Sequence, residues 1–351
     1  MKICFVLPQV SKDPVGGYKI VFEYANRLVK DNFDVSIVFI NDNAFKLRKI
    51  PHGLKHLIIN ARTQIQPRWF PLDKRIKKIS SVSKSKMKNI AENTTVVATD
   101  STTVDFVLKY FPKSKKFYLI QGYETWNMSK DELYKTYNLG FKKIVVSKWL
   151  KKIVDDHSDT KSIYIQNPIN INKYKINTPI SQRNKYILGM LYHESAGKGC
   201  KYTLKAIENL RKKYPKLQLI MFGTPKKPQN LPSWISYYRN ATQEQTISIY
   251  NKISIFAVGA LNEGFGLTGL EAMACGAALI TTDFPAVYEY AENKETALIS
   301  HRKNVREMEK NIDYLIQNND YRCQLAEKGA QSAKAFSWES AYNKFKKAIL
   351  G

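Results

Sequence analysis

Two glutamates in one glycine-containing segment have the spacing that most clearly suggests chemistry in this chain. The segment Asn262–Gly276 reads NEGFGLTGLEAMACG, follows an apolar stretch and has seven residues between Glu263 and Glu271. Its glycines permit close backbone approach, so amides near Phe265–Thr268 are expected to face a polar ligand at a helix start. Glu263 would lie in the loop and Glu271 about one turn into the helix. Carboxylates at two depths can accept hydrogen bonds from hydroxyls on different parts of one ligand.

The same segment also has a purely structural interpretation. Thr268 and Glu271 have the spacing of a capping box, and Gly276 is an ordinary helix stop. Capping accounts for Glu271 but not for Glu263 and the glycines beside it, so we expect a ligand site here.

No metal site is predicted. The four cysteines are far apart and form no Cys-x-x-Cys pair, and the five histidines show no credible ligand spacing with cysteines or acids. His52 and His56 are four residues apart, yet Pro51 and Gly53 argue against a helix there. The Gly-x-Ser-x-Gly elbow of serine hydrolases does not occur either.

The elements that would position such a site alternate between strands and helices. Met1–Leu7 is predicted to be a buried strand, and a loop ending in Gly16-Gly17, a helix and a strand at Asp34–Ile40 follow it as one β-α-β unit. Further strands are predicted at Leu57–Ile59, Thr95–Ala98, Phe117–Ile120, Lys143–Val146 and Ser162–Ile165.

A second alternating series begins after Asn167-Pro168. Strands are predicted at Tyr186–Leu191, Leu217–Phe222, Ile253–Val258 and Ala277–Thr281, and helices at Tyr202–Lys213, Glu244–Asn251 and Leu267–Cys275. This alternation is typical of parallel sheets covered by helices on both faces. The sequence therefore predicts an α/β protein of two Rossmann-like domains, in which ligands bind beyond the carboxyl ends of the strands.

Composition and charge narrow the class of protein. Apolar residues make up 44% of the chain, which excludes a disordered protein, and 56 Lys+Arg against 30 Asp+Glu give a formal charge of +26. The apolar stretch Ile3–Leu7 is too short for a signal-peptide core, and no run approaches the roughly 18 apolar residues of a membrane span. Widely spaced cysteines fit a reducing compartment. We therefore expect a soluble cytoplasmic protein with an unusually basic surface.

The segment Lys74–Lys88 concentrates this charge, with seven basic residues and no acid. Apolar residues recur in it at helical spacing, which predicts a basic helix with a narrow apolar stripe. Such a helix suits an anionic membrane surface, where each Lys or Arg is worth about 1 kcal/mol. A solvated outer helix is the alternative. The segment contains no recognised nucleic-acid motif, and the charge is spread over both halves of the chain, so we do not expect a nucleic-acid partner.

The glutamate segment, followed by Thr281-Thr282-Asp283 and Glu289-Tyr290, resembles retaining glycosyltransferase family 4 of the GT-B fold, in its bacterial surface-polysaccharide type. The flanking motifs occur in the family's order. They are the glycine loop Gly16-Gly17, the serine motif Val146-Ser147, the domain junction Asn167-Pro168-Ile169, the diphosphate lysine in Lys198-Gly199 and the final helix at Phe336-Ser337-Trp338-Glu339. The resemblance spans nearly the whole chain and is strongest in its second half.

This resemblance implies a domain organisation and a set of roles. Residues 1–170 would form an acceptor-side domain, on which a C-terminal helix at 336–351 packs back, and residues 171–335 a donor-binding domain facing it across a cleft. Glu271 would bind the ribose hydroxyls of a nucleotide-sugar and Lys198 its diphosphate. The donor sugar would be held by Glu263 with Phe265, Gly266, Leu267 and Thr268. Gly16 and Gly17 would bring the positive end of a helix to the same diphosphate.

Two departures from the family pattern leave roles open. The usual Arg before the lysine is missing, because Gly189 is followed by Met190, and Lys201, Lys205 or His193 could supply the charge. Gln121 stands where many members have a His, and it can donate a hydrogen bond but cannot act as a general base. Gln121 and Glu124 could orient an acceptor hydroxyl or, equally, cap a strand end.

The function implied by the resemblance is metal-independent glycosyl transfer with retention of configuration, using no cofactor. The donor would be a nucleotide-sugar, UDP-linked, and the acceptor a saccharide or lipid-linked saccharide in surface or exopolysaccharide assembly at the inner face of the cell membrane. The alternative is a non-catalytic protein of the same fold that binds polyanions through its basic surface, which the missing Arg and His would allow.

Overall fold

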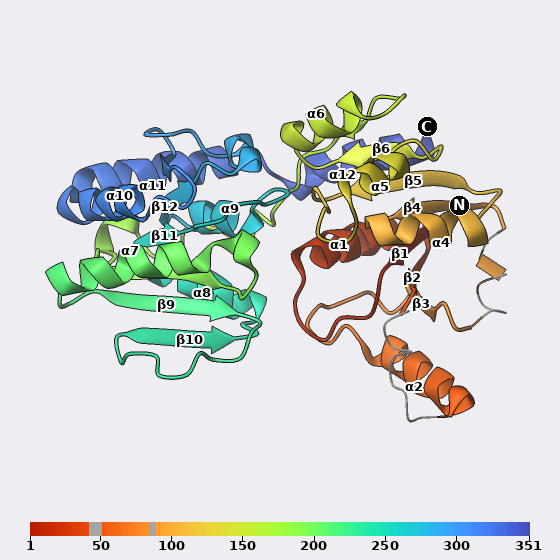
Figure 1. Ribbon diagram of the computed structural model, residues 1–351, viewed down its shortest axis with the longest axis horizontal. Helices are drawn as coiled ribbons and strands as arrows, with labels where there is room; N and C mark the ends of the chain where they lie inside the picture. Colours follow the sequence, from red (N-terminus) through yellow and green to blue (C-terminus); the bar gives the residue numbers. More distant parts are fainter. Residues whose placement is uncertain (42–50, 84–86, 88, 91) are drawn as a thin grey trace. The chain divides into compact units, whose positions relative to one another are not determined.

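The computed structural model describes residues 1–41, 51–83, 87, 89–90 and 92–351. This part of the chain divides into two compact units (Figure 1). The first unit comprises Met1–Ile165 and Tyr342–Gly351, and the second comprises Gln166–Ala341. Each unit is built on one parallel β-sheet wound with helices, so the predicted pair of Rossmann-like domains is confirmed.

The first unit has a seven-stranded sheet in the order β3-β2-β1-β4-β5-β6-β7. The strands are β1 (Lys2–Leu7), β2 (Asp34–Phe39), β3 (Lys77–Ser80), β4 (Thr94–Ala98), β5 (Lys115–Ile120), β6 (Lys142–Val145) and β7 (Ile163–Tyr164). The helices are α1 (Gly16–Lys30), α2 (His52–Ile65), α4 (Val104–Tyr110), α5 (Lys130–Thr136), α6 (Lys148–Asp156) and the last part of α12 (Trp338–Leu350).

Burial on both faces explains the continuous apolar run of β1. Phe5 is aligned with Ile37 of β2 on one side and with Val97 of β4 on the other. The strand is therefore central, and its residues from Ile3 to Leu7 are fully buried. Helix α1, which the sequence predicted, contributes an apolar face with Ile20, Val21, Tyr24, Leu28 and Val29 buried.

The second unit has a six-stranded sheet in the order β10-β9-β8-β11-β12-β13. The strands are β8 (Ile187–Tyr192), β9 (Gln218–Gly223), β10 (Ile235–Arg239), β11 (Ile255–Ala257), β12 (Ala278–Thr282) and β13 (Ala297–Ser300). The helices are α7 (Cys200–Lys213), α8 (Gln243–Lys252), α9 (Leu267–Ala274), α10 (Val305–Gln317), α11 (Asn319–Ala333) and the start of α12.

Each sheet has a topological switch point between its corresponding strands. The strand order reverses between β1 and β4 in the first unit and between β8 and β11 in the second. Loops that leave the carboxyl ends of neighbouring strands diverge at such a point and open a crevice for a ligand. The loops after β8 and β11 contain Lys198 and Glu263, so the topology brings the two predicted residues to one switch point.

The strand predicted at Leu57–Ile59 is wrong, because these residues lie inside α2. The prediction that Pro51 and Gly53 would prevent a helix at His52 is also wrong. Pro51 is the residue that caps the amino terminus of α2, where its missing N–H is not needed by the helix. A short apolar run does not by itself distinguish a strand from a helix.

The basic helix predicted at Lys74–Lys88 is wrong for Lys77–Ser80, whereas Met87, near the end of the segment, is helical. Lys77–Ser80 form the edge strand β3, which pairs in parallel with β2 from Ser36 to Phe39. Pairing with an existing strand buries Ile79 and Ser80 and outweighs the helical spacing of the apolar residues. Lys84, Lys86 and Lys88 lie outside the described residues. Among the described helices, none is long and apolar enough to cross a membrane.

Candidate functional site

Lys198 and Glu263 meet at the switch point of the second sheet. Lys198 ends a single 3-10 turn, Ala196–Lys198, after β8, and its Nζ donates to Oε1 of Glu263 at 2.6 Å. The two side chains are partly buried, with 32% of Lys198 and 15% of Glu263 exposed. The pair therefore offers a cation and a carboxylate at one position that solvent still reaches.

Backbone contacts hold these two loops against each other. The amides of Leu261 and Asn262 both donate to the carbonyl of Gly197, at 2.8 and 3.2 Å. Gly199 has φ +58°, and a Cβ there would lie 1.8 Å from the carbonyl oxygen of Gly259. Only glycine satisfies both the left-handed conformation and this approach, which gives the Lys-Gly sequence a physical reason.

The start of α9 forms the remaining wall of the site. Gly266 precedes the helix with φ +91°, and no side chain caps the amino terminus. The first N–H groups of the helix therefore remain available to donate to a ligand or to solvent. A narrow recess lies beside it. Its lining residues are Leu191, Lys198, Cys200, Thr203, Ala257, Val258, Gly259, Ala260, Glu263 and Thr268.

Glu271 lies deeper, in the second turn of α9, and is buried. The hydroxyl of Tyr250 donates to its Oε2 at 3.4 Å. Burial first, and then the charge of Glu271, raise the pKa of Tyr250 well above its ordinary value. The capping-box interpretation of Thr268 and Glu271 is wrong, because α9 begins at Leu267 and Gly266 takes the capping position. Gly276 follows the helix with φ +80°, in agreement with the predicted stop.

Of the three residues considered as a replacement for the missing Arg, His193 interacts electrostatically with both Lys198 and Glu263. Its Nδ1 accepts the N–H of Ser195 at 2.9 Å, which leaves a proton on Nε2 when the ring is neutral. Burial and then the charge of Lys198 lower the pKa of His193. Lys201 and Lys205 are exposed. Met190, which stands where the resembling family usually has an Arg, is buried in the core.

In the first unit, Gly17 and Gln121 come together. Gly16 and Gly17 open α1 directly after the loop that leaves β1, and the amino terminus of α1 has no side-chain cap. A Cβ on Gly17 would lie 3.2 Å from Nε2 of Gln121, so the amide of Gln121 packs over this glycine. Oε1 of Gln121 is buried and has no hydrogen-bond partner within the described residues. This contact was not predicted from the sequence.

Glu124 has a different environment from the one predicted. It is buried, and its Oε2 accepts the N–H of Ser101 at 2.6 Å, at the carboxyl end of β4. Burial and then the charge of Asp100 raise the pKa of Glu124 to about 8. In the part of the chain that the structure describes, no hydrogen bond joins Glu124 to Gln121. Trp126, for which the sequence predicted no role, lies 3.0 Å from a Cβ built on Gly122 and is 67% exposed.

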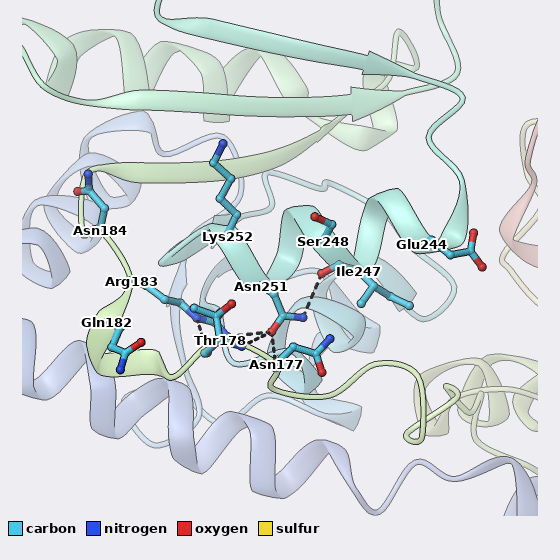
Figure 2. A pocket seen from close by; sticks show the side chains of 10 residues that line it. All are labelled: Asn177, Thr178, Gln182, Arg183, Asn184, Glu244, Ile247, Ser248, Asn251 and Lys252. Carbon is cyan, nitrogen blue, oxygen red and sulfur yellow. Dashed lines mark hydrogen bonds between the residues drawn. The ribbon is translucent and has the colours of Figure 1, made fainter.

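A larger cavity, of about 480 Å³, lies in the second unit between α8 and the segment before β8 (Figure 2). Arg183 lines it but is buried and fully occupied. Its guanidinium donates to the carbonyls of Thr178, Tyr250, Ile253 and Cys275 and to Oδ1 of Asn251. Arg183 therefore joins segments of the fold and has no donor left for an anion. In the described residues, no group of three or more His, Cys, Asp or Glu is placed to hold a metal ion.

The glutamate segment, the lysine and their sheet lie in a region that matches a known family. Residues 175–332 match the family model for glycosyl transferases group 1. The second unit contains a group 1 glycosyltransferase domain. Across 94% of this chain and 95% of the relative, the sequence is 23% identical to an uncharacterized glycosyltransferase of Haemophilus influenzae. Family 4 and the surface-polysaccharide type remain predictions.

Two further similarities involve proteins with more specific descriptions. Over 25% of this chain and 23% of the relative, the sequence is 30% identical to N,N'-diacetylbacillosaminyl-diphospho-undecaprenol alpha-1,3-N-acetylgalactosaminyltransferase of Campylobacter jejuni. The crystal structure of Anabaena Alr3699/HepE in complex with UDP and glucose superposes with a TM-score of 0.76 at 15% identity, covering 99% of both chains. This likeness establishes the GT-B fold.

Proposed function

We propose that the protein is a retaining, metal-independent glycosyltransferase that moves a sugar from a UDP-linked donor to a saccharide or lipid-linked saccharide in surface or exopolysaccharide assembly. The observation on which the proposal rests is the Lys198–Glu263 contact of 2.6 Å beside the amino terminus of α9. The UDP and glucose held by HepE and the diphospho-undecaprenol named for the Campylobacter enzyme support the choice of donor and acceptor classes.

In this proposal, the residues of the second unit divide the donor among them. The buried carboxylate of Glu271 binds the ribose hydroxyls, and Lys198 binds the diphosphate. Glu263 holds the sugar together with the amides of Phe265, Gly266 and Leu267, and Thr268 lines the recess below them. Carboxylates accept from hydroxyls, whereas amides and ammonium groups donate to anionic oxygens, so each group has a partner of the right polarity.

Charge separation in the donor explains why these groups would promote the reaction. When the bond between the anomeric carbon and the phosphate oxygen breaks, negative charge grows on the diphosphate and positive charge on the sugar. Groups fixed in advance and aimed at developing charge lower the barrier. The acceptor oxygen then bonds to the anomeric carbon from the same face, and its proton passes to the leaving phosphate. His193, with Nε2–H available, replaces the missing Arg as a second donor to the diphosphate.

The first unit supplies the other groups in this proposal. The amino terminus of α1 at Gly16-Gly17 faces the diphosphate, and Gln121, which packs over Gly17, orients the acceptor. Glu124 is protonated at neutral pH because of its raised pKa, so it would donate a hydrogen bond to the acceptor and not remove its proton. The acceptor of surface-polysaccharide assembly lies at the inner face of the membrane, where we place the protein as a peripheral component.

Calorimetric titration with uridine and with UDP tests the donor assignment. A charged hydrogen bond contributes about 1.5–3 kcal/mol, so Lys198→Met is expected to weaken UDP binding by on the order of 10- to 100-fold and to leave uridine binding unchanged. Glu271→Ala is expected to weaken both ligands, because both contain the ribose. Glu263→Ala should retain UDP binding but lose most of the slow hydrolysis of the UDP-sugar.

The matched control for Lys198→Met is Lys252→Met, which removes an exposed lysine from α8. This control should bind UDP as the unmodified protein does. A ratio of UDP to uridine affinity that is the same in Lys198→Met and in the unmodified protein would contradict the assignment. A protein that binds polyanions without catalysis would show neither saturable UDP binding nor donor hydrolysis.

A further inference from the structure

Helix α2 presents its apolar side chains to solvent. Leu54, Leu57, Ile58 and Ile65 are 50%, 68%, 39% and 52% exposed. Together with the exposed Ala61, they occupy positions i, i+3, i+4, i+7 and i+11, which lie on one face of a helix. A surface helix normally turns such a stripe towards the core, so α2 has the opposite orientation.

Polar contacts on the other face fix this orientation. Thr63 is fully buried, and its hydroxyl donates to the carbonyl of Ile59 at 2.8 Å and accepts from Nδ2 of Asn41 at 3.4 Å. Nε2 of Gln64 donates to the carbonyl of Lys78 in β3 at 2.7 Å. Helix α2 thus lies at the β3 edge of the first sheet (Figure 1), held by the face that carries the buried Ile59 and Thr63, and its exposed apolar stripe lies on the opposite face.

The charges around the stripe have one sign. Residues 51–72 contain Lys55, Arg62 and Arg68 but no Asp or Glu. Lys55 and Arg62 are seven residues apart, so they follow each other along the same side of the apolar stripe. By contrast, two basic residues of the neighbouring segment have acidic partners, because Arg75 pairs with Asp73 and Lys77 with Asp34 at 2.8 Å each.

We infer that α2 is an interfacial anchor that lies in the surface of an anionic lipid bilayer. An exposed apolar stripe bordered by lysine and arginine is the pattern of helices that bury one face at the boundary of headgroups and acyl chains. The basic side chains extend their aliphatic stems along the apolar surface and place their charges among the headgroups. A second copy of the chain fits this face less well, because a two-fold pairing of α2 would bring like charges together.

Flotation with lipid vesicles tests the inference on the full chain. The unmodified protein should float with vesicles of phosphatidylglycerol and phosphatidylcholine, but much less with phosphatidylcholine alone. Because the double variant Leu57→Ser/Ile65→Ser removes two large apolar side chains from the face that enters the bilayer, it should lower the partition coefficient at least about tenfold. Lys55→Gln/Arg62→Gln should lower it less and should remove most of its sensitivity to about 1 M salt.

The control is Leu139→Ser, which removes another exposed leucine of the first unit, 37% exposed, and should leave flotation unchanged. Thermal unfolding and UDP binding, measured without lipid, should be the same in all variants, so loss of flotation is separate from any failure of the proposed reaction. Flotation of Leu57→Ser/Ile65→Ser equal to that of the unmodified protein would overturn the inference. So would a dimer in solution that this double variant converts to a monomer, because the face would then cover a second copy.

Discussion

At the residue scale, the Lys198–Glu263 pair matters because both charges are satisfied before any ligand binds. Residues 65 positions apart in the chain meet at 2.6 Å with part of each side chain still exposed. Exposed ion pairs contribute little to stability, whereas a diphosphate offers Lys198 several anionic oxygens at once. The carboxylate released from Lys198 would then be available to hydroxyl donors. One exchange of partners would prepare both ends of the proposed donor site.

The sequence identified these two residues but not the state of Glu124. The loop around Glu263 can be predicted from its own residues, because the glycines and the helix start that define it are local features of the sequence. The pKa of Glu124 depends on Ser101 and Asp100, which follow a different strand. Spacing along the chain contains no information about such neighbours. The same reason explains why the contact between Gly17 and Gln121 was not predicted.

The raised pKa of Glu124 predicts a specific dependence of stability on pH. The folded protein holds this proton up to about pH 8, whereas the unfolded chain releases it near 4.5. The folded state therefore binds more protons between these values, and the free energy of unfolding should fall as the pH rises through this range. Glu124→Gln keeps an acceptor for the Ser101 amide and removes the titration. Thermal unfolding at a series of pH values should show that the variant loses this part of the decline.

The exposed acid Glu92 provides the control, because Glu92→Gln should leave the pH profile of the unmodified protein unchanged. Equal slopes in the unmodified protein and in Glu124→Gln between about pH 5 and pH 8 would show that Glu124 is ionised in the fold, contrary to its surroundings.

At the element scale, the position of Lys198 depends on how closely two loops approach. Gly199→Ala would place a Cβ 1.8 Å from the carbonyl oxygen of Gly259, at a φ of +58°. The left-handed conformation alone costs about 1–3 kcal/mol for a residue with a side chain, and the collision must also displace the loop that leads to Glu263. We expect a lower melting temperature and a UDP affinity reduced about as much as in Lys198→Met. Calorimetric titration and thermal unfolding measure these two effects.

Gly140→Ala separates the effect of backbone strain from the effect of the collision with Gly259. Gly140 also has a positive φ, +76°, but nothing lies within 4 Å of a Cβ built on it. This variant should lower stability through backbone strain alone and should leave UDP binding intact. If the two variants had the same UDP affinity, the contact between Gly199 and Gly259 would not be what positions Lys198.

The predictability of the elements follows from where each one is buried. Central strands such as β1 and β9 are enclosed on both faces, and their continuous apolar runs were identified from the sequence. Helix α2 and strand β3 lie at the edge of the sheet, where the pattern is misleading. In α2 the apolar stripe faces solvent, and β3 takes its conformation from pairing with β2. The conformation and orientation of an edge element depend on the elements that it contacts, and a single sequence does not show those contacts.

At the scale of the whole molecule, the last helix completes the first unit. Residues of α12 up to Ala341 belong to the second unit, and those from Tyr342 onward belong to the first. The hydroxyl of Tyr342 donates to Oδ2 of Asp31 at 2.8 Å, at the carboxyl end of α1. Tyr342 and Phe345 of α12 are buried, and Phe345 adds its ring to the core around β1. The first unit is therefore complete only when residues 342–351 have been made.

Phe345 is the residue through which this dependence can be measured. It is fully buried, and its ring stacks on Tyr24 and Phe5 with centroids 4.1 and 6.1 Å apart. Replacing a buried Phe by Ala typically costs about 3–5 kcal/mol, so Phe345→Ala should destabilise the first unit by that amount. Limited proteolysis followed by mass spectrometry should show faster cleavage within residues 1–165, while residues 186–330 keep their resistance. Tyr314→Ala, which removes a half-exposed ring from α10, should change neither region. Equal acceleration of cleavage in both regions would mean that the two units unfold as one, and the assignment of the last helix to the first unit's stability would fail.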